Sequence, residues 1–507
     1  MVRILLLLIF TMHFAIATPA QPIIQRCFPD HSPEVLARVR AGNKMCPQEI
    51  SARTQRRVTA QAALSKFMNL SLTTDQVPDI SLVCSGGGYR AALCTLGMLR
   101  GLAKIGLLDA TLYCSATSGA TWTIASWMSH NMNLDDLTAF IKEQVNYTLD
   151  FEDLDTIQII ESMVQKLGNG RSVSLNDIWG GILSNVFLSS NTNVDNGNVV
   201  RFSDLAPQVA AGLHPMPIFL SAIGNTSPSY QWAEHTPFEC GSPYLEAWVP
   251  TTAFGKKFDR GASHDPSPEE SLGYMLGFCG SAYAINFSDL IQGVKETMQT
   301  EHNLSVPTDW LSWLPSGDGT RISPPKVWNF ANKVKGCPLS SSSEITFVDG
   351  GLVFNIPIPA LLRRNVKLHI ICDATADALS VANNDMHIVQ SYLKKYIYPF
   401  PPIDYPSLVT QKISLLTHPT NQQAPIVVYL PNFASFSSFK LSYTTEEFDQ
   451  VVGGMEEAVV QNAEVFRQAI ALALQQITKT RSAKPQEKKQ GCVPCQQKRR
   501  KDQQNAA

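Results

Sequence analysis

The stretch "DISLVCSGGGYRAALCTLGMLRGLAKIGLLDATLYCSATSGATW", residues 79–122, decides the fold. Residues 79–85 form a short apolar run that stops at three glycines, as a buried strand does. Apolar residues then recur at helical spacing over 92–103, and a second apolar run, 110–116, leads into another small-residue turn. Two successive strand–turn–helix units predict an α/β fold, with a central, mostly parallel sheet flanked by helices.

The glycine turn "SGGGYR" follows the first predicted strand, at the sheet edge where ligand sites lie in such folds. Glycines let backbone N–H groups point into one small space, and the following helix adds partial positive charge. The phosphate-loop and dinucleotide fingerprints are both absent. We therefore expect an oxyanion hole with Gly87 and Gly88 as donors. Arg90 lies in the first helical turn, where an anionic partner such as a phosphate explains it better than the helix dipole does. The alternative is a tight turn with a solvent-facing arginine.

The serine turn "YCSATSGATW" departs from the nucleophile elbow G-x-S-x-G, because Ala116 and Ala120 occupy the glycine positions. Ser118 precedes Gly119 at the predicted turn apex, and a helix N-terminus behind it favours a nucleophile. The alternative for Ser118 is a helix N-cap. The neighbouring hydroxyls are expected to hydrogen-bond locally: Ser115, Thr117 and Thr121.

The segment "EITFVDGGLVFNIP" predicts a strand that ends at an Asp-Gly-Gly turn. A buried carboxylate at Asp349 can accept a serine proton directly, which predicts a Ser118–Asp349 dyad. The alternative is an ordinary Asp-Gly turn. A histidine-dependent esterase is a further alternative, because His387 and His418 follow Asp349 in Ser-Asp-His order.

The ends of the chain differ from its middle. Residues 1–20, "MVRILLLLIFTMHFAIATPA", have the layout of a signal peptide and predict the secretory pathway, either secretion or the lumen of the endoplasmic reticulum and endomembranes. The alternative is an uncleaved N-terminal anchor on a cytosolic or membrane-bound protein. Residues 21–75 are expected to form a helical extension, and 76–480 the catalytic domain. Within it, 286–343 is rich in Pro, Ser and Trp and predicts a cap or lid insertion. Residues 481–507 carry a net charge of +6 and predict a basic, disordered tail.

The net charge of −2 gives no reason to expect a nucleic-acid partner, and leaves −8 on residues 1–480 once the basic tail is set aside. Export would bring glycans and disulfides. Candidate glycan sites are Asn69, Asn146, Asn225, Asn286 and Asn303. The cysteine pairs considered are Cys27 with Cys46, and Cys240 with either Cys279 or Cys337.

Three of these motifs, "SGGGYR", "YCSATSGATW" and "VDGGLVFNIP", resemble the group IV cytosolic phospholipase A2 family within the patatin-like superfamily. The resemblance covers roughly residues 60–475 and includes further blocks in the family's order: "VSLNDIWGGIL", "YQWAEHTPFECGSP", "FGKKFDRG", "LGFCGSAYAINF" and "SFSSFKLSYTTEEFDQVV". It implies the patatin-like catalytic fold.

The resemblance also implies roles for the site residues. Ser118 is the expected nucleophile, Asp349 its general base, Gly87 and Gly88 the oxyanion donors, and Arg90 the contact to the lipid phosphate. No metal and no other cofactor is expected. The expected partner is a phospholipid membrane or micelle surface, with no obligatory protein partner.

The implied activity is hydrolysis of fatty-acyl esters of glycerophospholipids and lysophospholipids through an acyl-enzyme, with transacylation from the same intermediate. Calcium independence, as in the short gamma-type members, is expected because only about 60 residues precede the region of resemblance, too few for a C2 domain. A catalytically weak or inactive lipid-binding or storage protein is the alternative, and it rests on Ala116 and Ala120. Trp310, Leu311, Trp313 and Leu314 in the predicted insertion are candidates for membrane contact, and the alternative is that they form core beneath a loop.

Overall fold

The structure is a computed structural model. It describes residues 35–146, 166–168, 171, 173–188, 199–224, 230–281, 325–438, 440 and 442–483. The predicted signal segment lies outside the described residues, as do most of the predicted insertion and the tail from residue 484 on. The four candidates for membrane contact, Trp310, Leu311, Trp313 and Leu314, lie outside them too.

The two predicted βα units are confirmed. β3 (Ile80–Cys84) leads through the glycine turn into α3 (Gly88–Lys104), and β4 (Tyr113–Thr117) leads through the serine turn into α4 (Gly119–His130). Both strands are buried along their whole length, as expected of central parallel strands that are covered on both faces. They pair in parallel, so both turns lie at the same edge of the sheet.

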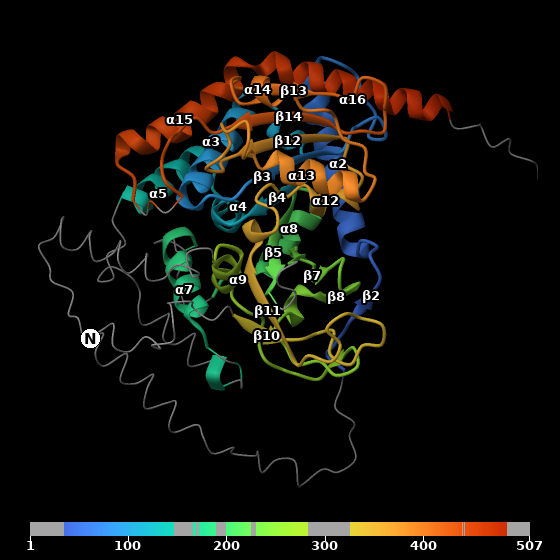
Figure 1. Ribbon diagram of the computed structural model, residues 1–507, viewed down its shortest axis with the longest axis vertical. Helices are drawn as coiled ribbons and strands as arrows, with labels where there is room; N and C mark the ends of the chain where they lie inside the picture. Colours follow the sequence, from blue (N-terminus) through green and yellow to red (C-terminus); the bar gives the residue numbers. More distant parts are fainter. Residues whose placement is uncertain are drawn as a thin grey trace, which may run out of the picture.

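The main sheet continues on both sides of these strands (Figure 1). Its order is β13 (Ser414–Leu416), β14 (Ile426–Pro431), β12 (Leu368–Asp373), β3, β4, β5 (Met216–Ile223), β6 (Gln231–His235), β7 (Glu239–Ser242), β8 (Ala247–Pro250) and β2 (Arg40–Ala41). The strands from β14 to β5 are all parallel, and antiparallel strands extend the sheet at either side. The predicted central, mostly parallel sheet is therefore confirmed.

A further pair of strands joins the sheet at β5. β11 (Glu344–Asp349) pairs antiparallel with the end of β5 and with β10 (Lys326–Trp328). On β5, Thr117 of β4 lies opposite Leu220, and Asp349 of β11 lies opposite the next residue, Ser221. β4 and β11 thus approach each other along one strand and end next to each other.

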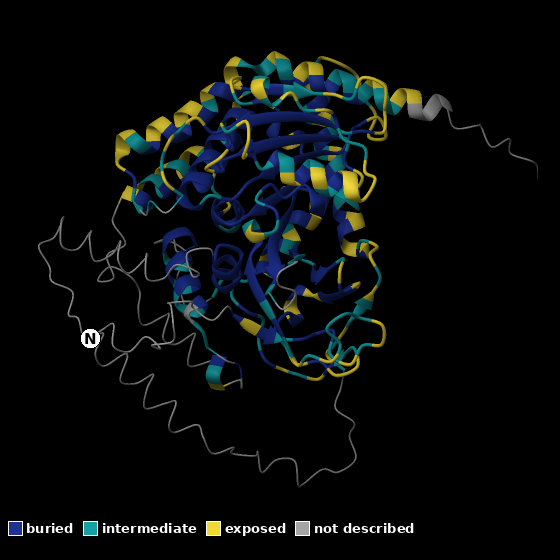
Figure 2. Cartoon of the chain, in the orientation of Figure 1, coloured by how far each residue is buried: buried dark blue, intermediate teal, exposed yellow. Residues whose placement is uncertain are grey.

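Helices cover the sheet (Figure 1). They include α2 (Pro47–Met68), α5 (Leu134–Asn146), α7 (Leu175–Phe187), α9 (Leu272–Cys279), α12 (Pro359–Leu362), α13 (Met386–Lys395), α15 (Thr445–Gln461) and α16 (Ala463–Ala483). α15 packs on α3, and α16 packs on β14. Figure 2 shows the strands buried and the outward sides of the helices exposed.

Three segments differ in detail from the sequence expectation. The helical pattern after residue 445 is divided at Asn462, whose Nδ2 donates to the Ala458 carbonyl at 2.8 Å. α16 continues to Ala483, past the residue where the tail was expected to begin. The N-terminal range contains α2, and the short strands β1 (Ala37–Arg38) and β2 precede it.

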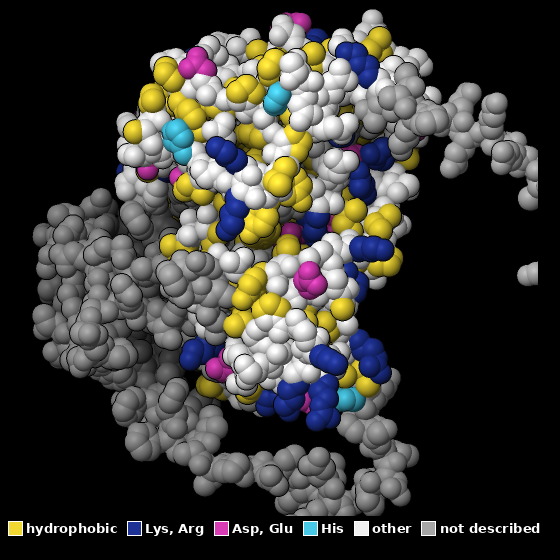
Figure 3. All heavy atoms as spheres, turned by 45° about the vertical axis from the view of Figure 1, so that its right-hand side comes forward, with side chains coloured by type: hydrophobic (Ala, Val, Ile, Leu, Met, Phe, Trp, Pro, Cys, Tyr) yellow, Lys and Arg dark blue, Asp and Glu magenta, His cyan; other side chains and the backbone are white. Residues whose placement is uncertain are grey.

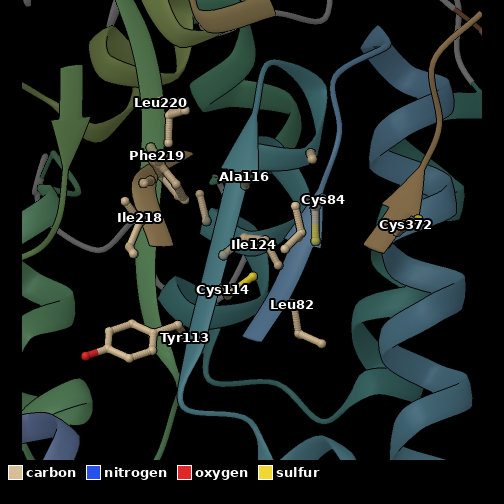
Figure 4. Close-up of a cluster of buried hydrophobic side chains, with 14 of the residues drawn as sticks. Leu82, Cys84, Tyr113, Cys114, Ala116, Ile124, Ile218, Phe219, Leu220 and Cys372 are labelled. Atoms are coloured by element: carbon tan, nitrogen blue, oxygen red, sulfur yellow. The ribbon is translucent and has the colours of Figure 1, made fainter. Parts of the chain in front are cut away.

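The core between the central strands and helices is apolar and contains several thiols (Figure 4). Cys84, Cys114 and Cys372 lie on three of the parallel strands and are fully buried. In the part of the chain that the structure describes, Cys240, Cys279 and Cys337 are free thiols, so neither pairing considered for Cys240 is present.

Candidate active site

The structure brings together the two residues of the predicted dyad. Ser118 Oγ donates a hydrogen bond of 2.9 Å to Asp349 Oδ2. Both side chains are buried, with exposed fractions of 5% and 1%. Ser118 occupies the N-cap position of α4, but its side chain makes no capping hydrogen bond. The hydroxyl is therefore directed at a carboxylate, as a nucleophile requires, and the N-cap alternative does not account for it.

The serine turn has strained backbone geometry at one residue. Ser118 has φ 51° and ψ −131°, a conformation that few residues other than glycine adopt. Ala116 and Ala120 are not among the residues with positive φ, so their methyl groups fit ordinary backbone conformations. Gly119 is different, because a Cβ there would lie 1.9 Å from the Gly88 carbonyl oxygen. The turn therefore needs glycine at position 119 and tolerates alanine at positions 116 and 120.

Asp349 is oriented by the Asp-Gly-Gly turn. Its Oδ1 accepts a 2.8 Å hydrogen bond from the Gly351 N–H, and its own N–H donates to Ser281 Oγ at 3.0 Å. These bonds fix the carboxylate so that Oδ2 faces Ser118. Ser281 follows α9 within the block "LGFCGSAYAINF", which is part of the family resemblance, although no role was expected for Ser281 from the sequence.

The glycine turn lies directly against the serine turn. Gly87 and Gly88 have φ of 139° and 60°, and a Cβ at Gly86 would lie 3.0 Å from Ser118 Cβ. The backbone N–H groups of Gly87 and Gly88 meet no acceptor among the described residues. Since α3 and α4 both begin here, two partially positive helix ends converge on Ser118. This geometry suits the expected oxyanion donors.

Arg90 has different partners from the expected lipid phosphate. The guanidinium is buried, and its Nε donates to the Ala374 carbonyl at 2.8 Å. The other nitrogens donate to the Phe436 carbonyl and, at 2.7 Å, to Ser438 Oγ. In this structure Arg90 ties the glycine turn to the loops that follow β12 and β14. These three bonds use three of the five guanidinium N–H groups, and the expected contact of Arg90 with a lipid phosphate stays a prediction.

Hydroxyls on β4 also deviate from the local bonding that the sequence predicts. Ser115 Oγ donates to the Pro357 carbonyl at 2.8 Å, and Thr117 Oγ1 donates to the Phe354 carbonyl at 3.5 Å. Thr121 Oγ1 does bond locally, to the Ser118 carbonyl at 2.6 Å. The strand before Ser118 is thus fastened to the segment after Asp349, which reinforces the dyad.

The histidines considered as catalytic bases have other partners. His369 Nδ1 lies 2.8 Å from Ser81 Oγ inside the sheet. His387 Nε2 lies 2.9 Å from the Val381 carbonyl, and His418 accepts backbone N–H groups of its own loop. The geometry therefore favours the Ser–Asp dyad over a histidine-dependent esterase.

Among the described residues, one buried group has the composition of a metal site: Cys46, Glu49 and Glu239. Both carboxylates already face arginines. Glu49 binds Arg364 at 2.6 Å, and Glu239 binds Arg40 at 2.7 Å. Arg364 also binds Glu234 of β6 at 2.7 Å, so the group joins α2 to the sheet. These contacts explain the buried charges as structural ion pairs.

Residues 80–399 match the lysophospholipase catalytic domain family, and this segment contains the serine–aspartate pair, the glycine turn and Arg90. The chain belongs to the group IV cytosolic phospholipase A2 family.

Its relatives within this family are distant. Cytosolic phospholipase A2 epsilon from Homo sapiens is 24% identical over 87% of this chain and 61% of its own length, and the zeta protein from Mus musculus is 26% identical over 86% and 62%. The gamma protein from Mus musculus is 31% identical over 44% of this chain and 36% of its own. The chain thus spans less than two thirds of the length of these relatives.

A solved structure shares the fold. Human GIVD cytosolic phospholipase A2 aligns with a TM-score of 0.74 at 20% identity, over 88% of this chain and 67% of that chain. The same human protein has been solved in complex with methyl gamma-linolenyl fluorophosphonate. The cytosolic phospholipase A2 type of α/β fold expected from the sequence is confirmed.

Proposed function

We propose that this chain is a phospholipase A2 and lysophospholipase that hydrolyses fatty-acyl esters of glycerophospholipids. The observation that carries the proposal is the 2.9 Å hydrogen bond from Ser118 Oγ to Asp349 Oδ2, beside the two N–H groups of the glycine turn. Acyl transfer needs a nucleophile, a base and donors for the oxyanion, and a buried serine–carboxylate pair next to backbone N–H groups supplies all three.

In the first half-reaction, Ser118 Oγ attacks the ester carbonyl carbon while its proton moves to Asp349 Oδ2. The negative charge on the former carbonyl oxygen is stabilised by the N–H groups of Gly87 and Gly88. The tetrahedral intermediate then collapses, the C–O bond to glycerol breaks, and Asp349 returns the proton to the leaving alkoxide. The products are an acyl ester on Ser118 and the released alcohol, which is a lysophospholipid when the substrate is a diacyl phospholipid and a glycerophosphodiester when it is a lysophospholipid.

In the second half-reaction, Asp349 takes a proton from water, and the resulting hydroxide attacks the acyl ester. Ser118 leaves with the proton, and the fatty acid is released. A hydroxyl of a second lysophospholipid can replace water at this step, which gives transacylation. Hydrolysis and acyl transfer therefore share one intermediate.

The dyad takes both nucleophile and base from the chain itself, and we propose that turnover does not require Ca²⁺. We also propose that the protein enters the secretory pathway and acts there on a membrane or micelle surface, on the strength of its N-terminal segment. None of the described helices combines the length and apolarity needed to cross a bilayer.

The test uses mixed micelles of phosphatidylcholine, with and without a calcium chelator, and a fluorophosphonate that forms a stable adduct with activated serines. We expect fatty-acid release in both conditions, labelling of Ser118, and loss of both in the S118A variant. Wild-type rates in S118A would overturn the assignment. Mass spectrometry of the mature N-terminus and its glycans tests the location.

A further inference from the structure

The helix α13 ends in an unusual C-cap. The Tyr398 N–H donates to the Leu393 carbonyl at 2.9 Å, and the Ile397 N–H donates to the Lys394 carbonyl at 3.2 Å. This bond pattern is the Schellman motif, whose left-handed position is normally glycine. Here it is Ile397, with φ 59°. A β-branched residue in this conformation is strained. Because Ile397 is also 90% exposed, packing within the fold does not explain why isoleucine occupies this position.

Residues 394–398, the α13 tip, combine apolar, aromatic and basic side chains at the surface. Ile397 is 90% exposed, and Tyr396 and Tyr398 are 50% and 44% exposed. Lys394 and Lys395 precede them in the last helical turn and are exposed too. Tyrosines around a protruding aliphatic residue, with lysines beside them, are the composition of segments that lie at a membrane–water interface.

The α13 tip is rigidly connected to the active-site loops. Tyr392, one turn before the tip, packs with its ring centroid 4.7 Å from that of Phe354 and 5.3 Å from that of Trp232. Phe354 follows Asp349 in the loop whose carbonyl binds Thr117. A helix of this length extends about 15 Å. The tip therefore stands at a fixed place relative to the catalytic pair.

Further exposed apolar side chains follow the ends of the strands that carry the site. Leu352 lies after β11, Leu379 and Val381 after β12, and Phe433 after β14. On the face that Figure 3 turns forward, hydrophobic side chains gather at the height of α13, with Lys and Arg side chains beside them. Apolar side chains are thus exposed in the loops around the site as well as at the tip.

We propose that the α13 tip inserts into the lipid surface that presents the substrate, with Ile397 entering the acyl boundary and Lys394 and Lys395 binding anionic headgroups. This inference rests on the proposed phospholipase function and names the surface on which it acts. The charge argument is local: residues 1–480 are net acidic at −8, so attraction to anionic lipid has to come from basic residues placed at the contact.

Vesicle sedimentation tests the proposal without requiring turnover. All variants are made in the S118A background and mixed with vesicles of phosphatidylcholine, alone or with phosphatidylserine. I397N removes the apolar side chain without adding backbone strain, because asparagine tolerates the left-handed conformation. L213N is the matched control, since Leu213 is 62% exposed and precedes β5, at the opposite edge of the sheet.

We expect I397N to lower partitioning onto both vesicle types about tenfold, with an unchanged or higher Tm. K394Q/K395Q should lower partitioning about fivefold per lysine, and only on the vesicles that contain phosphatidylserine. L213N should bind like its parent. Parental binding by I397N, an equal loss in L213N, or no vesicle binding by the parent would each overturn the proposal.

Turnover separates this proposal from the catalytic one. With Ser118 restored, I397N should hydrolyse a monomeric water-soluble ester at the wild-type rate and lose activity only on vesicles. If no substrate is hydrolysed but vesicle binding still depends on Ile397, the catalytic proposal fails and the membrane contact stands.

Discussion

Thr117 and Asp349 pair with consecutive residues of β5, although they lie on strands that run in opposite directions. Because β4 ends at Thr117, Ser118 is the next residue and lies beside the carboxylate at the end of β11. The catalytic geometry is thus a consequence of strand register on a third strand. Each side of the dyad is then fixed by its own contacts, to Phe354 and Pro357 on one side and to Ser281 and Gly351 on the other.

Replacing Asp349 with asparagine keeps the shape of the side chain and removes its ability to accept the serine proton. We expect kcat to fall about 10⁴-fold with little change in Tm, and fluorophosphonate labelling to slow as well. The measurement is fatty-acid release together with labelling rate. The control is D449N, the same substitution at a carboxylate of α15 whose side chain is 60% exposed, and it should keep the activity. Wild-type turnover in D349N would show that another group acts as the base.

The two alanines of the serine turn can be tested directly. A116G and A120G restore glycines at the elbow positions, and we expect neither to raise kcat, because neither alanine has positive φ. Each should lower the free energy of unfolding by about 0.5–1 kcal/mol through added backbone freedom. Chemical denaturation and kinetics on one substrate series check both statements.

Gly119 gives the opposite prediction from its neighbours. G119A places a methyl group against the Gly88 carbonyl, so either the fold loses stability or the glycine turn moves. We expect a loss of about 1–3 kcal/mol and a fall in kcat that exceeds any change in KM. An active G119A protein with wild-type stability would show that the two turns are not in contact.

Arg90 can be assigned to loop positioning or to phosphate binding by comparing substrates. R90K keeps the charge but cannot reproduce the three hydrogen bonds to Ala374, Phe436 and Ser438. If Arg90 positions the glycine turn, kcat should fall about 10- to 100-fold on a phosphate-free ester and on a phospholipid alike. A loss confined to phospholipid, expressed in KM, would identify Arg90 as a phosphate ligand instead.

The ion pairs around Arg364 give a stability prediction. Arg364 is fully buried between Glu49 of α2 and Glu234 of β6. Replacing it with methionine leaves the buried Glu49 carboxylate without its arginine, while Glu234 keeps Arg363 at 2.8 Å, and we expect a loss of about 3–5 kcal/mol in the free energy of unfolding. The double variant E49Q/R364M removes the unpaired charge and should recover much of this loss. Equal stability of R364M and wild type would contradict the buried network.

Two buried histidines make the fold sensitive to acid. Burial lowers the pKa of His369 to about 4 and that of His235 to about 3. Unfolded histidine titrates near 6.5, so below that pH the unfolded chain binds more protons than the folded one. Stability is therefore full above about pH 6.5, and it falls as the pH drops toward 4, by about 1.4 kcal/mol per pH unit for each histidine. Chemical denaturation between pH 7.5 and 4.5 should show this slope in the free energy of unfolding. H369N and H235N should each remove the contribution of one histidine to the slope.

The sequence predicts the local units of the fold because their signals are local. Glycine runs, apolar strands and helical spacing over residues 79–122 are readable within one short window. They place Ser118 at a strand end, and the same kind of signal over residues 344–357 places Asp349 at another. What brings them together is the pairing of β4 and β11 on β5, and no short-range pattern encodes which distant strands pair.

The partners of Arg90 and Ser115 show the same limit. An arginine in a first helical turn suggests an anion, yet its acceptors are a carbonyl after β12 and two groups after β14, brought there by the parallel sheet. Ser115 bonds the Pro357 carbonyl rather than its own strand for the same reason. Local rules describe the side chain correctly as a donor and cannot name an acceptor supplied by another part of the chain.

The distance along the chain between the two catalytic residues has a consequence for biosynthesis. Ser118 emerges from the ribosome 231 residues before Asp349, and strand β11 cannot complete the sheet edge until both it and β5 have been made. During this interval the growing chain carries a nucleophile without its base. The hydrolytic activity proposed for this chain therefore cannot arise until its catalytic domain is nearly complete.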